Sequence, residues 1–336
     1  MKYILLLIIG VVAGAAGAFF LDRTPSYRPK VDDVLSQLSS PIVKYGKVSD
    51  DVFAETMEKY SIESCFVRDP ALKDEDPVWM TREPLGPNGL AREPEHPVPD
   101  LSELPGLVKI EQILSESGSQ KHHCAATRIG KNWFLTAAHC VRMKGSASSP
   151  VVDMVIVEPS EDVAQEETVI VPIDGAICHS AWYSQTGKFD DDIALVHVSD
   201  VSALNNVSVA VFDHAAAPLP PETYEETHFA GWGKNGRNRF LQGGKLNIVE
   251  IGETFILGDN GGEFSPCVGD SGGPLYVDTS NGKRVVGVLS SVSKDACPPY
   301  EWSFYTRVKT FQPWIDTAMS LCRQDGQFVC RDYRLN

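Results

Sequence analysis

Basic residues are few in this sequence relative to acidic ones, and they form no Lys/Arg-rich run. The 336 residues include 30 Lys and Arg against 45 Asp and Glu, so the formal net charge is −15 at pH 7. A field of this sign repels phosphate backbones. We therefore expect a protein that does not bind nucleic acid.

Motifs for metals and cofactors are also missing. The sequence contains no C-x-x-C pair, no calcium-binding loop and no cofactor motif, so we expect no metal site and no bound cofactor. The pair His122-His123 beside Cys124 is interpreted as the polar end of a strand rather than as a set of metal ligands.

The composition is that of a folded globular protein. Hydrophobic residues make up 43% of the chain and charged residues 22%, which excludes a disordered chain, a collagen-like chain and a polytopic membrane protein. At about 150 residues per domain, the length predicts two domains or one large one.

One uncharged run opens the chain. Lys2 precedes residues 3–21, which carry no charge, and Ala16-Gly17-Ala18 supplies the small residues of a signal peptidase site. Because the run is 19 residues long, it also approaches the roughly 20 residues that span a bilayer as a helix. Residues 1–21 are therefore predicted to be a signal peptide or a membrane anchor. We expect the protein to be secreted, periplasmic or extracellular, with membrane contact only if residues 3–21 are retained.

The eight cysteines are an even number, which fits an oxidising compartment and up to four disulfides. Residues 22–106 are acidic and rich in turns, and residues 70–106 contain eight prolines. This composition predicts a pro-region or linker. Within it, residues 48–64 show a weak helical pattern, which indicates a small helical appendage.

From residue 107 onward the sequence changes character. Short apolar runs rich in Val, Ile and aromatic residues alternate with Gly, Asn, Asp and Pro turns, which indicates an all-β barrel or sandwich. Residues 311–319 are the exception, because Phe311, Trp314, Ile315 and Ala318 share one face of a helix.

Three motifs far apart in the sequence supply residue types suited to nucleophilic catalysis: T-A-A-H-C with His139, D-I-A-L with Asp192 and G-D-S-G-G-P with Ser271. A serine hydroxyl is a poor nucleophile at neutral pH and needs an imidazole to take its proton. The imidazole needs a carboxylate to fix its tautomer and stabilise its charged form. Taken alone, Ser271 is as well explained as a turn serine, His139 as a core histidine and Asp192 as a solvated acid. Taken together and in this order, the three residues predict a catalytic triad.

The glycines beside Ser271 support this interpretation. They allow the backbone to turn sharply, so that the N–H groups of Gly269 and Ser271 can converge on one developing oxyanion.

The motifs and their order, His then Asp then Ser, resemble those of the chymotrypsin/trypsin-type serine endopeptidases. The resemblance covers roughly residues 107–320 and includes Phe229–Gly233, Tyr305–Val308 and Trp314-Ile315. It implies an all-β fold of two six-stranded antiparallel β-barrels with the active site in the cleft between them, plus a C-terminal helix. Residues 107–320 would then be the protease domain and residues 321–336 a C-terminal tail.

The resemblance also selects Asp192 among the three consecutive acids at residues 190–192, because the buried carboxylate of the family directly precedes a strand such as Ile193–Leu195. It pairs two sets of cysteines, Cys124 with Cys140 at the histidine loop and Cys267 with Cys297 at the pocket wall.

The other four cysteines are assigned less directly. Cys322 and Cys330 are separated by seven residues after the closing helix, which predicts a local loop. Elimination leaves Cys65 to pair with Cys178, tying the N-terminal region to the protease domain.

The family places the residue six before the nucleophile at the base of the specificity pocket, and here that residue is Ser265. An uncharged serine disfavours Arg or Lys, whose charge would be left unpaired. Two wall positions that are glycines in deep pockets are Val292 and Ser303 here. This resembles the shallow pocket of elastase-like members and predicts cleavage after Ala, Val, Ser or Thr, with aromatics as the alternative.

The strand Ser290–Val292 is expected to pair with an extended substrate. Ser291 stands where the family usually has an aromatic residue, so the shape of the next subsite departs from the family pattern.

The activation signal of the family is not visible. Trypsin-type zymogens mature at an Ile/Val-Val-Gly-Gly-like start, whose new ammonium group pairs with the acid next to the nucleophile, here Asp270. Between Pro84 and Leu107 no such start occurs, and both Arg82 and Arg92 are followed by Glu-Pro. Either the processing of this zymogen is unusual, or Asp270 has another partner and the chain folds active without cleavage.

These features predict a hydrolase, an exported serine endopeptidase that cleaves a protein or peptide substrate through an acyl-enzyme intermediate. Two alternatives stay open. One is a catalytically silent binding protein on the same fold, and the other is a membrane-anchored regulatory protease that cuts one protein partner.

Overall fold

The structure is a computed structural model, and it describes residues 50–69, 99–114, 121–142, 153–157, 169–184, 191–213, 219, 224–225, 227–233, 241–259, 265–293 and 302–330. The predicted signal peptide or anchor at residues 1–21 lies outside this part of the chain. Among the described residues, no helix has both the length and the apolar character needed to cross a bilayer.

The first sheet has eight strands. In spatial order they are β1 (Ile62–Val67), β7 (Gly175–His179), β8 (Ala194–His197), β4 (Trp133–Thr136), β3 (Lys121–Arg128), β2 (Leu107–Ile113), β5 (Asp153–Val157) and β6 (Ile170–Pro172). Each neighbouring pair is antiparallel. Strands such as β4 and β5 are buried along their whole length, which fits their mostly apolar sequences.

The second sheet has seven strands, and six of them close into a barrel. In spatial order they are β13 (Pro274–Thr279), β10 (Thr227–Gly231), β11 (Gln242–Ile251), β12 (Phe255–Asp259), β15 (Trp302–Arg307), β14 (Gly282–Val292) and β9 (Val211–Phe212). A further ladder between β13 and β14 closes the ring, and β9 adds to β14 in parallel.

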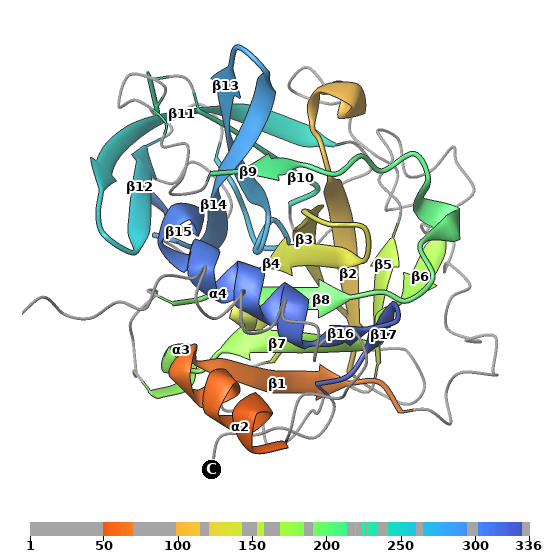
Figure 1. Ribbon diagram of the computed structural model, residues 1–336. Coiled ribbons are helices and arrows are strands. Elements are labelled where there is room, and N and C mark those ends of the chain that lie inside the picture. The colour runs from red at the N-terminus through yellow and green to blue at the C-terminus, as the bar shows by residue number, and fades with distance from the viewer. Residues whose placement is uncertain are drawn as a thin grey trace, which may run out of the picture. The chain divides into compact units, whose positions relative to one another are not determined.

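The predicted all-β fold with a C-terminal helix is confirmed, and the strand count of the first sheet differs from the six expected. One of the two additional strands is β1, at the edge of the sheet, which comes from the stretch for which the sequence predicts a pro-region or linker. The ladder between β1 and β7 runs from Ile62 paired with His179 to Val67 paired with Gly175. Figure 1 shows β1 and α2 (Asp50–Lys59) beside β7, at the end of the molecule away from β11 to β13.

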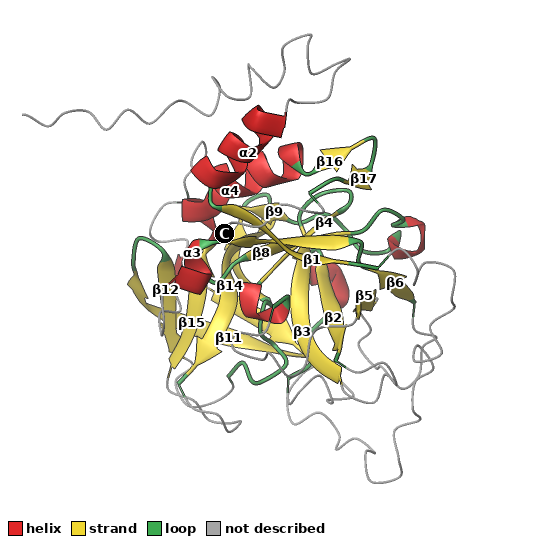
Figure 2. Cartoon of the chain, turned by 90° about the horizontal axis from the view of Figure 1, so that it is seen from below, coloured by secondary structure: helices red, strands yellow, loops and turns green. Residues whose placement is uncertain are grey.

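Helices cover the first sheet. The C-terminal helix α4 (Val308–Leu321) buries Phe311, Trp314, Ile315 and Ala318, the face predicted from the sequence. A short hairpin of β16 (Arg323–Gln324) and β17 (Gln327–Phe328) follows α4 (Figure 2). The remaining helical turns are α3 (Ala181–Ser184), η4 (Leu101–Glu103), η5 (Ala138–Cys140) and η6 (Ser202–Leu204).

Candidate active site

His139 lies on η5, the single helical turn that follows β4. All four residues of β4 are buried, so the turn leaves the core at a fixed point. A disulfide between Cys124 on β3 and Cys140 on η5 holds this turn against the sheet. The histidine side chain remains 26% exposed, which leaves the ring accessible to a substrate.

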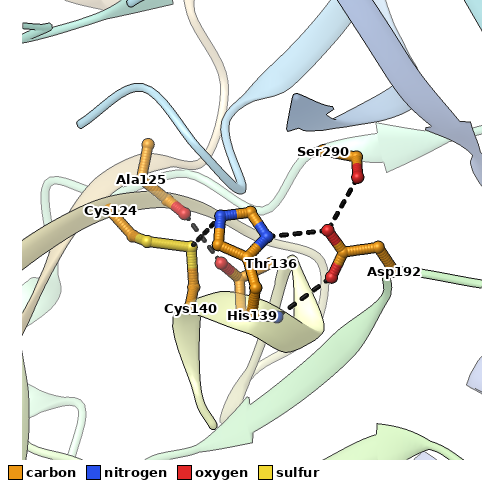
Figure 3. The surroundings of a disulfide bond; sticks show 7 residues. All are labelled: Cys124, Ala125, Thr136, His139, Cys140, Asp192 and Ser290. Atoms are coloured by element: carbon orange, nitrogen blue, oxygen red, sulfur yellow. Dashed lines mark hydrogen bonds and ion pairs between the residues drawn. A yellow bond between two sulfur atoms is a disulfide. The ribbon is translucent and has the colours of Figure 1, made fainter. Parts of the chain in front are cut away.

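Asp192 orients the imidazole (Figure 3). Its Oδ2 lies 2.7 Å from Nδ1 of His139, and its Oδ1 accepts a hydrogen bond of 2.9 Å from the backbone N–H of His139. The Asp192 side chain is 3% exposed. Because one carboxylate binds both the ring and the backbone of His139, the tautomer and the position of the ring are fixed together.

The second sheet also holds Asp192. Ser290 on β14 donates its hydroxyl to Oδ2 at 2.7 Å, and Thr306 on β15 donates to the Asp192 carbonyl at 3.0 Å. Asp192 itself lies two residues before β8 of the first sheet. The histidine–carboxylate pair therefore depends on contacts from both sheets, as expected for a site in the cleft between two barrels.

The charge of Asp192 governs the basicity of His139. Burial alone would lower the pKa of the imidazole, but the charge and hydrogen bond of Asp192 outweigh burial and raise that pKa above its usual value. A ring of this kind is suited to accept a proton and to carry the resulting positive charge.

Ser271 is brought to the same place through its backbone. Its carbonyl accepts a hydrogen bond of 2.7 Å from Ala125, next to the disulfide that holds η5. The following Gly272 has a φ of 77°, and a Cβ there would lie 2.1 Å from Oγ1 of Thr136 at the end of β4. Only glycine allows this close approach, which brings the Ser271 turn against the strand that leads to His139.

The Ser271 hydroxyl makes no hydrogen bond to the His139 ring within the described part of the chain. Instead, Nε2 of His139 lies 3.7 Å from Sγ of Cys140. The structure thus forms the histidine–carboxylate half of the predicted triad and leaves the serine–histidine bond unmade. In free enzymes catalytic hydrogen bonds are often long or misaligned and tighten when substrate binds.

The backbone before Ser271 fits the predicted oxyanion site. Gly269 has a φ of 102°, which favours glycine, and lies in a turn closed by a 2.9 Å bond from the Asp270 N–H to the Cys267 carbonyl. Within the described residues, the N–H groups of Gly269 and Ser271 donate to no other group. Both are therefore available to a developing negative charge.

Asp270 is held by backbone amides. Its Oδ1 accepts a 2.7 Å hydrogen bond from Gly233 and its Oδ2 a 2.9 Å bond from Cys267, while no cation of the described residues pairs with it. Because the side chain is buried, its pKa rises to about 6 in spite of these two bonds. In the unbroken chain, the acid beside the nucleophile thus has partners other than a new N-terminus.

The predicted pocket residues lie on neighbouring segments. Ser265 and Ser303 are almost fully buried, and Val292 on β14 pairs with Ser303 on β15. Ser290, another of the predicted pocket residues, donates its hydroxyl to Asp192. Ser291 has a buried hydroxyl without a hydrogen-bond partner in the described residues. The β13–β14 ladder ends at Val288, and Leu289 still exchanges backbone hydrogen bonds with Gly272 and Gly273.

Three disulfides match the predicted pairs: Cys65–Cys178, Cys124–Cys140 and Cys322–Cys330. Cys267 is also disulfide-bonded, and its predicted partner Cys297 lies outside the described residues. The side-chain nitrogen of His139 and the sulfurs of Cys124 and Cys140 lie within 4.8 Å of one another. Since both sulfurs belong to a disulfide, this cluster offers no thiolate to a metal ion.

Two contributors to the site were missed in the sequence. In the sequence, Thr306 belongs to the segment Tyr305–Val308 that resembles the family, and the hydroxyl of Ser290 has no predicted role. Ser290 follows the apolar run Val285–Leu289, and Thr306 follows Phe304 and Tyr305. A polar residue at the end of such a run is the signal that could have drawn attention to them.

Comparison with known proteins agrees with this geometry. Residues 110–315 match the trypsin family. Chymotrypsin-like elastase family member 1 of Macaca fascicularis is 30% identical over 230 residues, which cover 62% of this chain and 83% of that protein. Chymotrypsin-like elastase family member 3B of Homo sapiens is 30% identical over 228 residues, or 61% of this chain and 81% of that protein.

Proproteinase E of Bos taurus is 28% identical over 227 residues, which cover 61% of this chain and 87% of that protein. The family match spans more than half of the chain and contains His139, Asp192 and Ser271. The chain belongs to the trypsin family and is a serine endopeptidase.

Proposed function

We propose that this protein is an exported endopeptidase that cleaves after small aliphatic residues, with Ser271 as nucleophile, His139 as general base and acid, and Asp192 as the group that orients His139. The observation that carries the proposal is the buried Asp192–His139 pair, with a 2.7 Å bond between Oδ2 and Nδ1. An imidazole held in this way can accept a proton from a nucleophile. Ser271 lies on a turn that packs against the end of β4, the strand that leads to His139.

Acylation follows from these positions. Ser271 Oγ turns to Nε2 of His139, gives up its proton and attacks the carbonyl carbon of the substrate, while the Gly269 and Ser271 N–H groups receive the oxyanion. As the tetrahedral intermediate collapses, the C–N bond breaks and His139 returns the proton to the leaving amine. Asp192 stays ionised and stabilises the imidazolium in between.

Deacylation repeats the sequence with water. His139 takes a proton from a water molecule, the hydroxide attacks the ester carbon, and the second intermediate collapses with return of the proton to Ser271 Oγ. The products are a free carboxylate, a free amine and the unchanged enzyme.

The pocket residues support a preference for small side chains. Ser265 at the base offers no charge to an Arg or Lys, and Val292 faces Ser303 across the β14–β15 ladder. A side chain too large to enter forgoes about 0.8 kcal/mol for each methylene left unburied. The relatives named as chymotrypsin-like elastases point to the same class of substrate.

Export is supported by the disulfides and by the uncharged run at residues 3–21. Disulfides persist in oxidising compartments. We expect the protein to act outside the cytoplasm on protein or peptide substrates.

The test combines an active-site probe with a substrate library. The purified full chain should react with a fluorophosphonate at Ser271, Ser271→Ala should not, and the library should be cut after Ala, Val, Ser or Thr. An unlabelled wild-type chain would indicate the catalytically silent binding protein instead.

Two further results would revise the details. Cleavage mainly after aromatic residues would overturn the shallow pocket. Intact mass of the chain from its native host separates secretion from a retained anchor, because loss of residues 1–21 supports secretion.

A further inference from the structure

Residues 50–69, here called the N-terminal segment, are built into the catalytic domain. The segment consists of α2, a tight turn at Ser61 and the edge strand β1. Its position in the sequence, upstream of the proline-rich stretch, is where a removable pro-region is expected. The structure instead gives it four separate attachments to the protease fold.

The first attachment is the sheet itself. The β1–β7 ladder is antiparallel, and the disulfide Cys65–Cys178 crosses it. Beyond the strand, the Arg68 N–H continues the pattern with a 3.0 Å bond to the Asp174 carbonyl. The segment is therefore linked both covalently and by backbone hydrogen bonds.

The second attachment is a buried ion pair. Arg68 binds Asp153 on β5 through Nε to Oδ1 at 3.0 Å and through a terminal nitrogen to Oδ2 at 3.0 Å. Asp153 is fully buried and Arg68 is 6% exposed. Removal of the segment would leave the Asp153 charge buried and unpaired, which proteins tolerate poorly.

The third attachment joins the segment to the C-terminal part of the chain. The Ser61 carbonyl accepts hydrogen bonds from the Ser180 N–H at 2.9 Å and from Nε1 of Trp314 on α4 at 3.3 Å. Met57 on α2 is fully buried, and its Sδ lies 3.9 Å from Sγ of Cys330. The two ends of the described chain thus pack on each other.

The fourth attachment reaches the catalytic histidine segment. The carboxylate of Glu63 on β1 forms an ion pair of 3.1 Å with the guanidinium of Arg142. Arg142 lies three residues after His139 in the sequence. The segment therefore borders the loop that carries the general base, through an ion pair whose arginine is 44% exposed.

We infer that the N-terminal segment is a permanent second chain of the mature enzyme: a cut between residues 70 and 98 leaves it bound, so proteolysis there does not release a free catalytic domain. This goes beyond the proposed activity, because it concerns which parts of the chain stay together.

The experiment uses the full chain with a recognition sequence for a site-specific protease in place of residues 85–91. After cutting, we expect one species on a denaturing gel without reductant, two with reductant, and co-elution of both fragments in native buffer. Two separate species without reductant would overturn the inference. The readout is chain association, so it is independent of whether Ser271 is the nucleophile.

Cysteine variants separate the disulfide from the strand. Cys65→Ser with Cys178→Ser should give two species on the non-reducing denaturing gel yet still co-elute in native buffer. The matched control is Cys322→Ser with Cys330→Ser. Its two fragments should stay joined both on the non-reducing denaturing gel and in native buffer. Separation of the Cys65/Cys178 variant in native buffer would refute the role of β1 as a structural strand.

Hydrogen exchange covers the case in which the cysteine variants do not fold. The amides of residues 62–67 in the cut wild-type chain should keep the protection that they have in the intact chain. Loss of that protection after cutting would show that β1 leaves the sheet, against the inference.

Discussion

At the scale of single residues, the Asp192 carboxylate accepts a hydrogen bond from the hydroxyl of Ser290 on the second sheet. Ser290→Ala removes this 2.7 Å bond and leaves the His139 contacts in place. We expect kcat to fall about 10-fold or more, because a hydrogen bond to a charged group contributes ~1.5–3 kcal/mol. Steady-state kinetics with a small-residue peptide measure the effect.

Ser64→Ala is the matched control for Ser290→Ala. It removes a buried hydroxyl on β1 that has no hydrogen-bond partner in the described structure. Its kcat should equal that of the wild type. Equal kcat values for wild type and Ser290→Ala would contradict a role for the hydroxyl in holding Asp192.

A second residue sets a pH dependence of stability. His179 lies edge-on to Phe311 and Trp314 of α4, and burial lowers its pKa to about 4. Between pH 6.5 and 4 the unfolded chain takes up a proton that the native state resists. Native stability therefore falls as the pH falls through this window, by up to about 3 kcal/mol.

His179→Phe tests this dependence, with urea unfolding at pH 4.5 and 7.5 as the measurement. Asp270, whose pKa is raised to about 6, acts in the opposite direction, because its stabilising contribution is lost as the pH rises through that value. The informative quantity is therefore the difference between variant and wild type. The variant should lose less stability on acidification, and an identical loss would refute the assignment.

At the scale of elements, we expect the paired strands β14 and β15 to set the depth of the proposed pocket. Val292→Gly with Ser303→Gly removes the two side chains that face each other across the ladder. We expect kcat/KM for a Phe-containing peptide to rise at least 10-fold relative to the Ala peptide, since each additional buried methylene contributes about 0.8 kcal/mol. If the ratio of kcat/KM for the two peptides is unchanged while fluorophosphonate labelling is normal, residues other than Val292 and Ser303 determine the selectivity.

The contact between β5 and the N-terminal segment carries a stability prediction. Arg68→Met leaves Asp153 buried without its partner, which should destabilise the fold by about 3–5 kcal/mol and lower Tm by roughly 10 °C. Adding Asp153→Leu removes the unpaired charge and should recover most of the loss. Thermal unfolding of the three proteins measures this, and a single variant as stable as the wild type would show that the pair contributes little.

At the scale of the whole molecule, local sequence predicted the all-β character of residues 107–320 and the closing helix. Runs such as Trp133–Thr136 and the helical face of Phe311 and Trp314 carry their periodicity within one element. The strand β1 was not predicted, because its partner β7 begins more than a hundred residues away. Periodicity indicates which face is buried but does not identify a distant pairing partner.

The candidate site shows the same division. His139, Asp192 and Ser271 were predicted because each lies in a recognisable motif. The Ser290 and Thr306 hydroxyls were missed as partners of Asp192, and the unmade bond between Ser271 and His139 was not anticipated. These depend on side-chain directions across two sheets, which no local pattern encodes.

The double support of Asp192 has one more consequence. Because Ser290 and Thr306 reach this acid from the second sheet, the first sheet alone carries the imidazole without the hydroxyls that steady its carboxylate. A chain divided between Asp213 and Thr227 would yield two halves, each inert by itself. Peptide cleavage would then return only upon their reassembly, so the enzyme could serve as a split reporter of proximity between two fused proteins.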